Sequence, residues 1–127
     1  MNDTLGTRFA HALGHKDSVA LKELLAADVD FRAMTPGRIW ESSTASDVVD
    51  ATLLGSWFAP DEHITAIDRI ESGTVGARHR VGYQFAVTNL DGDFVVEQQA
   101  YFDVDPTSEK ISWLRIICSG FQASSPN

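Results

Sequence analysis

The half of the chain that follows Pro60 consists of strand-like segments separated by short turn signals. Residues 63–71, 75–89, 94–103 and 111–121 are rich in β-branched and aromatic residues and alternate between apolar and polar side chains. Between them lie Ser72-Gly73, Asp91-Gly92 and Asp105-Pro106, which are typical of tight turns. This half of the chain therefore predicts a four-stranded antiparallel meander.

The first 60 residues have helical spacing of apolar residues instead. We predict helices over residues 4–14, from the capping residue Asp17 to about residue 28, and over about 45–58 with Ser43 or Thr44 as the cap. A short, irregular strand is expected over 29–34, with a turn at residues 35–37 before 38–41. The order predicts one α+β domain over residues 1–127, with three N-terminal helices on one face of a curved, mainly antiparallel sheet and a flexible tail from residue 123.

Composition excludes several classes of partner. The formal charge of −8 and the pI of about 4.7 disfavour nucleic acid, because both chains would be negative. A single cysteine, Cys118, permits no internal disulfide, and no Cys/His cluster suggests a metal. No apolar run approaches the length of a membrane span. We therefore expect a cytoplasmic protein with no cofactor, metal, nucleic acid or membrane partner.

Strand alternation predicts which residues face the helices. Every second residue from 75 to 87, from 96 to 104 and from 114 to 118 is mostly apolar, so the side chains at these positions are expected inside. The opposite face still carries Tyr101, Trp113 and Ile117. We therefore predict a homodimer that packs sheet against sheet and covers them.

Two alternations compete in residues 63–71, and the expected hairpin decides between them. A turn at residues 72–74 would place Asp68 opposite Ala77 and Ala66 opposite His79. Asp68 and His79 would then be diagonal neighbours that face the interior.

The order of elements, with residues 7–17, 24–40 and 95–121, resembles the nuclear transport factor 2-like superfamily. This superfamily includes ketosteroid isomerases, limonene epoxide hydrolases and SnoaL-type polyketide cyclases. The resemblance implies a cone around one largely apolar pocket for a small molecule. The three functional groups of the ketosteroid isomerases fall on Phe9, Ala33 and Ala100, so a shared cone is expected without that reaction. The epoxide hydrolase pattern is also incomplete, because the arginines of the meander are expected outside. An acid and a histidine in the pocket are of the kind that SnoaL-type cyclases use.

Asp68 and His79 are the candidate catalytic pair, because a carboxylate can orient an imidazole whose pKa lies near neutral pH. Tyr83 and Gln98 are polar residues at apolar positions and are candidates for orienting a substrate. Trp40 and Met34, at the expected mouth of the cone, and Phe9 and Cys118 complete the predicted binding residues. The structural alternative for His79 is a core histidine with one hydrogen bond, and for Tyr83 and Gln98 it is packing with partners on neighbouring strands.

Three functions are compatible with these residues. The first is a cofactor-independent enzyme, such as an isomerase, cyclase or dehydratase, that moves a proton on a hydrophobic small molecule. The second is a binding protein for a lipid-like or aromatic ligand. The third is a dimeric scaffold with a filled interior.

Overall fold

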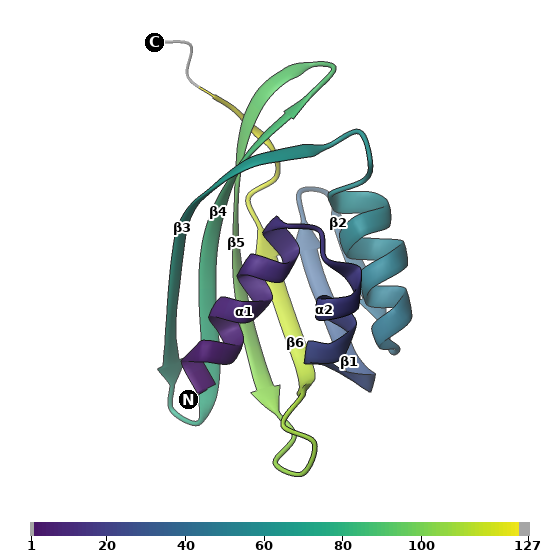
Figure 1. Ribbon diagram of the computed structural model, residues 1–127, viewed down its shortest axis with the longest axis vertical. Helices are drawn as coiled ribbons and strands as arrows, with labels where there is room; N and C mark the ends of the chain where they lie inside the picture. The colour runs from purple at the N-terminus through teal and green to yellow at the C-terminus, as the bar shows by residue number, and fades with distance from the viewer. Residues whose placement is uncertain (1, 125–127) are drawn as a thin grey trace.

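The computed structural model describes residues 2–124, and the side chains of residues 5–124. The helices are α1 (Asn2–Gly14), α2 (Ser18–Leu24) and η1 (Asp47–Trp57), and they lie together on one side of a single sheet (Figure 1). The strands are β1 (Leu25–Thr35), β2 (Arg38–Ser42), β3 (His63–Val75), β4 (Arg78–Asn89), β5 (Gly92–Val104), β6 (Ile111–Cys118) and β7 (Gln122–Ala123).

Side-chain caps fix where two helices begin. A carboxylate oxygen of Asp17 accepts a hydrogen bond from the backbone N–H of Ala20 at 3.0 Å, as expected for the start of α2. Thr44 Oγ1 accepts from the backbone N–H of Asp47 at 3.1 Å at the start of the third helix. That helix is wider than expected, because its turns are of the π type, and Phe58 N–H bonds to the carbonyl of Leu53 five residues earlier.

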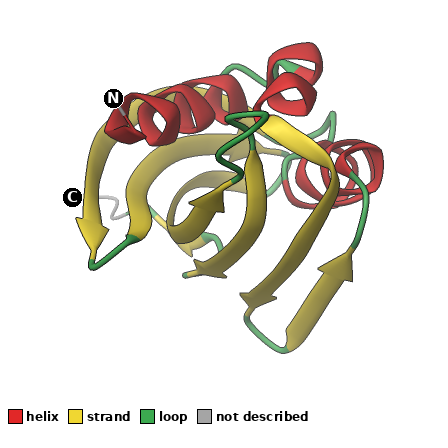
Figure 2. Cartoon of the chain, turned by 90° about the horizontal axis from the view of Figure 1, so that it is seen from below, coloured by secondary structure: helices red, strands yellow, loops and turns green. Residues whose placement is uncertain are grey.

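The strands form one curved sheet in the order β2-β1-β6-β5-β4-β3, with β7 added beside β5. All neighbours are antiparallel except β1 and β6, which are parallel. Seen from below, the sheet curls around the space under the helices (Figure 2). The predicted α+β architecture and its curved, mainly antiparallel sheet are confirmed.

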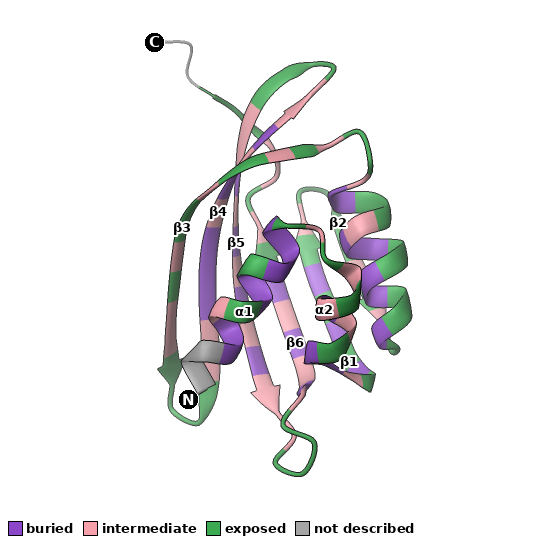
Figure 3. Ribbon diagram, viewed as in Figure 1, coloured by how far each residue is buried: buried purple, intermediate pink, exposed green. Residues whose placement is uncertain are grey.

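The core lies between the helices and the concave face of the sheet. Buried residues alternate along β4, β5 and the part of β6 from Leu114 onward, which confirms most of the inner positions expected there (Figure 3). Val75 and Ala77 were also expected inside and are exposed, because they lie at the turn between β3 and β4. The largest fully buried side chains are Tyr83, Phe9, Phe31, Phe58, Phe85, Phe102, Leu13, Leu21, Leu25, Leu53, Ile111 and Leu114. No helix of the described residues is long and apolar enough to cross a membrane.

The β3–β4 hairpin differs from the prediction. Val75 pairs with Arg78, so the turn is at Gly76-Ala77 and not at residues 72–74. Gly76 has φ +60°, a conformation that favours glycine and therefore favours a tight turn at this point. Gly73 lies inside β3 instead, where its missing side chain leaves room for the guanidinium of Arg80.

Two irregularities in β3 change which side chains face inward. The pairing shifts by one residue between Ile64 and Ala66 and again between Ile67 and Arg69. Each shift inserts an extra residue into β3, as in a β-bulge, and turns the following side chains to the other face. Ile67 therefore takes the inner position expected for Asp68.

A two-residue strand closes the described part of the chain. Ala123, where the flexible tail is expected to begin, belongs to β7 and pairs with Phe94 of β5. Residues 125–127 lie outside the described part of the chain.

Candidate functional site

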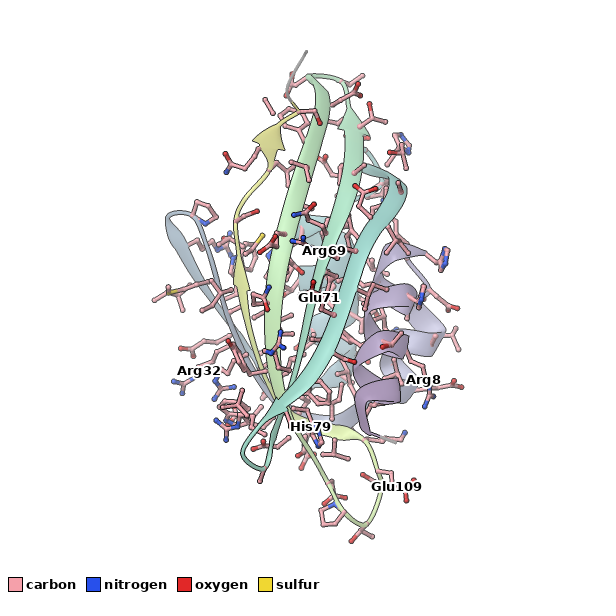
Figure 4. All side chains as sticks on the ribbon, turned by 90° about the vertical axis from the view of Figure 1, so that its left-hand side faces the viewer. Arg8, Arg32, Arg69, Glu71, His79 and Glu109 are labelled. Carbon is pink, nitrogen blue, oxygen red and sulfur yellow. The ribbon has the colours of Figure 1, made fainter. Side chains whose placement is uncertain are left out.

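The predicted Asp68–His79 pair is wrong, because the two residues lie at different places along the sheet. Asp68 is the extra residue at the second irregularity of β3, and its side chain is exposed. His79 pairs with Thr74, six residues further along that strand, a separation of about 20 Å at the rise of a β-strand. Arg69, the neighbour of Asp68, accordingly lies well above His79 in Figure 4.

His79 does face inward, near the end of the sheet beside the β3–β4 turn. Its ring stacks on Phe102 of β5, with centroids 5.2 Å apart and an angle of 29° between the planes. Its Nδ1 is buried and has no hydrogen-bond partner. The expected single hydrogen bond is therefore absent at this nitrogen, and the side chain is held by ring stacking.

A polar row crosses the middle of the inner face. Cys118 of β6 pairs with Gln98 of β5, which pairs with Tyr83 of β4. The Tyr83 hydroxyl donates a hydrogen bond of 2.6 Å to Gln98 Oε1, and both side chains are buried, with Gln98 only 1% exposed. Gln98 Nε2 is buried and has no partner. The amide of Gln98 therefore has a hydrogen-bond partner at its oxygen and none at its nitrogen.

Burial changes the acidity of this row. It raises the pKa of Tyr83 well above 10.0, and the nearby Cys118 acts in the same direction. Tyr83 is therefore a neutral hydrogen-bond donor at neutral pH. The Cys118 thiol is half-buried and accepts a hydrogen bond from the backbone N–H of Gly120 at 3.3 Å.

A second unsatisfied donor comes from η1. Trp57 Nε1 is buried without a partner, while its ring lies 5.9 Å from Trp40, edge to face, and 6.2 Å from Phe31. Trp40 occupies the sheet row next to that of Gln98, a row that also contains the small residues Ala33 and Ala100. The two unsatisfied donors thus lie on a helix and a sheet that enclose the same interior.

The remaining predicted binding residues divide between the two faces of the sheet. Trp40 is on the inner face, half-buried, and its Nε1 donates to Thr35 Oγ1 at 2.8 Å. Phe9 is buried 6.3 Å from the ring of Tyr83. Met34 was expected at the pocket and is instead on the outer face, 50% exposed, because the alternation of β1 turns Ala33 inward. The prediction for Met34 is therefore wrong.

Sequence reasoning missed Trp57 as a functional candidate. Trp57 falls within the helix predicted over about 45–58, where a large ring is typical of a buried apolar position. An indole carries an N–H that needs a partner when buried, and this property of the residue type was the available signal. Among the described residues, no three His, Cys, Asp or Glu side chains are grouped as a metal site would require.

Comparisons with known proteins agree with this architecture. No protein-family model matches the sequence, and no curated protein does. Among solved structures, an LEH-like epoxide hydrolase from M. tuberculosis is 17% identical, with a TM-score of 0.65 over 93% of this chain and 82% of that one. A proposed SnoaL-like polyketide cyclase from Shewanella denitrificans is 13% identical, with a TM-score of 0.68 over 93% and 90%.

A proposed isomerase from Bacillus subtilis is 10% identical, with a TM-score of 0.73 over 93% of this chain and 86% of that one. At such identities the likeness is one of fold and carries no reaction. It does agree with the order of the elements and with the curved sheet described above. The chain therefore has the cone fold of the nuclear transport factor 2-like superfamily.

Proposed function

We propose that the protein binds a hydrophobic small molecule that carries a carbonyl or carboxylate oxygen, and that Gln98 Nε2 donates a hydrogen bond to this oxygen. The observation that supports this proposal most is the buried amide of Gln98, whose oxygen is occupied by Tyr83 while its nitrogen has no partner. An unpaired buried donor costs about 1–3 kcal/mol, so a fold seldom retains one without a use.

The surroundings of Gln98 favour an apolar ligand. The interior is lined by aromatic and aliphatic side chains, and Trp57 offers a second buried N–H from the opposite layer. At the border of the core, Trp40, Phe121 and Cys118 are only partly buried. A flat, largely apolar molecule with one acceptor group fits these chemical properties best.

A binding role is better supported than acid–base catalysis. The catalytic hypothesis required Asp68 beside His79, and Asp68 is exposed on a distant part of β3. Tyr83 stays protonated, and its hydroxyl already donates its hydrogen bond to Gln98. Tyr83 and Gln98 therefore supply hydrogen-bond donors, and the neutral Tyr83 does not serve as a base.

A matched pair of probes tests the proposal. Fluorenone and fluorene have the same ring system, and only fluorenone has a carbonyl oxygen. We expect the purified protein to bind fluorenone about fivefold to tenfold more tightly than fluorene, as one net hydrogen bond provides. The binding constants are measured by titration calorimetry, with binding inside the cone checked by the chemical shift of the Trp57 indole N–H.

The variant Gln98→Met keeps the length of the side chain and removes the amide. It should bind both probes equally, while Gln99→Met, one residue away on the outer face, should keep the preference for fluorenone. Failure of the wild-type protein to bind either probe, or equal binding of both, would contradict the proposal.

A further inference from the structure

A thiol lies beside the unpaired amide nitrogen of Gln98. Cys118 of β6 and Gln98 of β5 are directly opposite each other on adjacent antiparallel strands, and both side chains pack against the core. Side chains at such positions have Cβ atoms about 5 Å apart. Because the two ends of an amide diverge and the oxygen bonds to Tyr83 of β4, the nitrogen points away from the Tyr83 hydroxyl. A nucleophile and a free hydrogen-bond donor therefore adjoin each other on the inner face.

The turn after β6 holds the sulfur in place. Gly120 has φ +77°, a conformation that favours glycine, and its backbone N–H turns back to donate to Cys118 Sγ at 3.3 Å. A β-carbon at this glycine would lie 2.7 Å from Cγ of Pro36, so a larger residue requires movement. The hydroxyl of Ser119 fixes the same turn, because it accepts a hydrogen bond of 2.9 Å from the backbone N–H of Glu97. The sulfur is therefore positioned before a ligand arrives.

The position of Cys118 at the border of the core makes the thiol reachable. Its side chain is half-buried, whereas Gln98 beside it is almost fully buried. A ligand can therefore reach the sulfur from solvent and extend inward over the amide. Partial exposure is typical of reactive cysteines, because a thiol that is sealed in the core meets no reagent.

The chemistry of the two groups selects one class of ligand. Gln98 Nε2 can donate a hydrogen bond to a carbonyl oxygen, but an amide does not give up its proton to a leaving group or an oxyanion. An α,β-unsaturated carbonyl compound needs no such proton transfer, because its β-carbon, three bonds from the oxygen, accepts the sulfur directly. The soft, polarisable sulfur of cysteine also suits this carbon better than the carbonyl carbon. A conjugated carbonyl compound is flat, as the proposed ligand is.

We propose that Cys118 captures α,β-unsaturated carbonyl compounds covalently while Gln98 Nε2 holds their carbonyl oxygen. This inference rests on the proposed function, because the same oxygen is the acceptor there. The thiol proton passes to water, the sulfur forms a bond to the β-carbon, and the π electrons of the carbon–carbon double bond move toward the oxygen. Gln98 stabilises the negative charge that develops on this oxygen. Water then returns a proton to the α-carbon, so the net reaction adds S–H across the double bond without an oxidant or a leaving group.

Chalcone and two relatives of similar shape test the capture. Chalcone carries an α,β-unsaturated ketone between two phenyl rings, whereas dihydrochalcone lacks the double bond and trans-stilbene lacks the carbonyl. At mildly alkaline pH, where cysteine thiols begin to ionise, intact-mass spectrometry should show one adduct with the full mass of chalcone on the wild-type protein. Neither relative should add. A peptide map should place the adduct on Cys118, and Cys118→Ser should form none.

The rate of addition separates a positioned site from a thiol that is merely accessible. In the folded wild type the rate should level off as the chalcone concentration rises, because binding precedes reaction. At low concentration it should exceed the rate of a peptide of residues 115–121 about tenfold or more. Gln98→Met should slow the addition about tenfold or more, because the donor to the developing charge is lost. Gln99→Met, on the outer face, should keep the wild-type rate.

Fluorenone connects this test to the proposed function. It should compete with chalcone and slow the addition, and its own binding should persist in Cys118→Ser. Addition no faster than in the peptide, or a rate that saturating fluorenone does not lower, would overturn the capture and leave the binding of fluorenone intact. Both of these measurements use the wild type, so the outcome does not rest on the folding of a variant. Loss of the preference for fluorenone over fluorene would contradict the proposed function, and the capture with it.

Discussion

The hydroxyl of Tyr83 and the side-chain oxygen of Gln98 are joined by a 2.6 Å hydrogen bond between adjacent strands of the core. The bond fixes which end of the amide is occupied and leaves Nε2 for another acceptor. Each partner satisfies a group that would otherwise be buried alone. The pair is therefore strongly coupled, and this coupling can be measured.

Removing either partner alone should lower the free energy of unfolding by more than half of the loss caused by removing both. Tyr83→Phe leaves the Gln98 oxygen without its donor and should lower the free energy of unfolding by about 1–3 kcal/mol. Gln98→Leu should act similarly on the Tyr83 hydroxyl. The double variant should lose less stability than the sum of the two single losses, by about 1 kcal/mol or more. Urea unfolding of all four proteins in a double-mutant cycle measures this difference. Simple additivity would contradict a direct bond.

The same tyrosine should make stability depend on pH in the alkaline range. Burial raises the pKa of Tyr83 in the folded state above its ordinary value of 10.0. A raised pKa means that stability is fully present below pH 10.0 and is lost as the pH rises above it, since the unfolded chain then releases the proton more readily. Wild-type protein should lose stability above pH 10.0 more steeply than Tyr83→Phe. Parallel pH profiles of unfolding would exclude Tyr83 as the cause.

Lys16 connects the turn between α1 and α2 to the loop that follows η1. Its ammonium group donates to the carbonyl of Ala59 at 2.9 Å and also to that of Glu62. Partial burial lowers the pKa of Lys16, while Glu62 acts in the opposite direction. Lys16→Met should therefore lower the free energy of unfolding by about 1–2 kcal/mol and increase hydrogen exchange over residues 59–62.

Lys22→Met is the control for the loss of a lysine charge. Lys22 pairs with Asp50 at 2.7 Å, but the pair is exposed, so its removal should change the free energy of unfolding by less than about 1 kcal/mol. Equal effects of the two substitutions would show that the contacts of Lys16 with the carbonyls add nothing.

His79→Phe should be tolerated by the fold. The substitution removes a buried nitrogen that has no partner and keeps a flat ring to stack on Phe102. Thermal unfolding should show a stability equal to that of the wild type or up to about 1 kcal/mol greater. Binding of fluorenone should not change, because His79 lies two rows from Gln98 along β4. A large loss of stability would point to a hydrogen-bond partner for the imidazole.

Alternation along the strands predicted much of the interior. β4 and β5 keep a regular period of two, and β6 does so from Leu114 onward, so the inner positions of Tyr83, Gln98 and Cys118 followed from the sequence. The helix caps at Asp17 and Thr44 followed from residue type, because a side-chain oxygen satisfies N–H groups that the first turn leaves free.

The site could not be predicted where this period breaks. Asp68 was placed by a turn assigned to residues 72–74, whereas Gly76 forms the turn, and two extra residues in β3 then shift the register. Nothing in the local composition indicates a bulge, because it depends on how a strand bends against its neighbour. The prediction for Met34 was wrong for another reason. Both faces of this sheet carry apolar side chains, so the apolar character of a residue does not reveal which face it occupies.

The parallel pairing of β1 with β6 joins segments that are far apart in the sequence, including Phe31 with Leu114 and Met34 with Ile117. During synthesis, β1 can pair with β2 soon after both leave the ribosome, but its other edge must wait until residues 111–118 are available. Until then the exposed edge and its apolar side chains can pair with other chains. Folding should therefore end with the closure of the sheet at β6, a late step that requires nearly the whole chain.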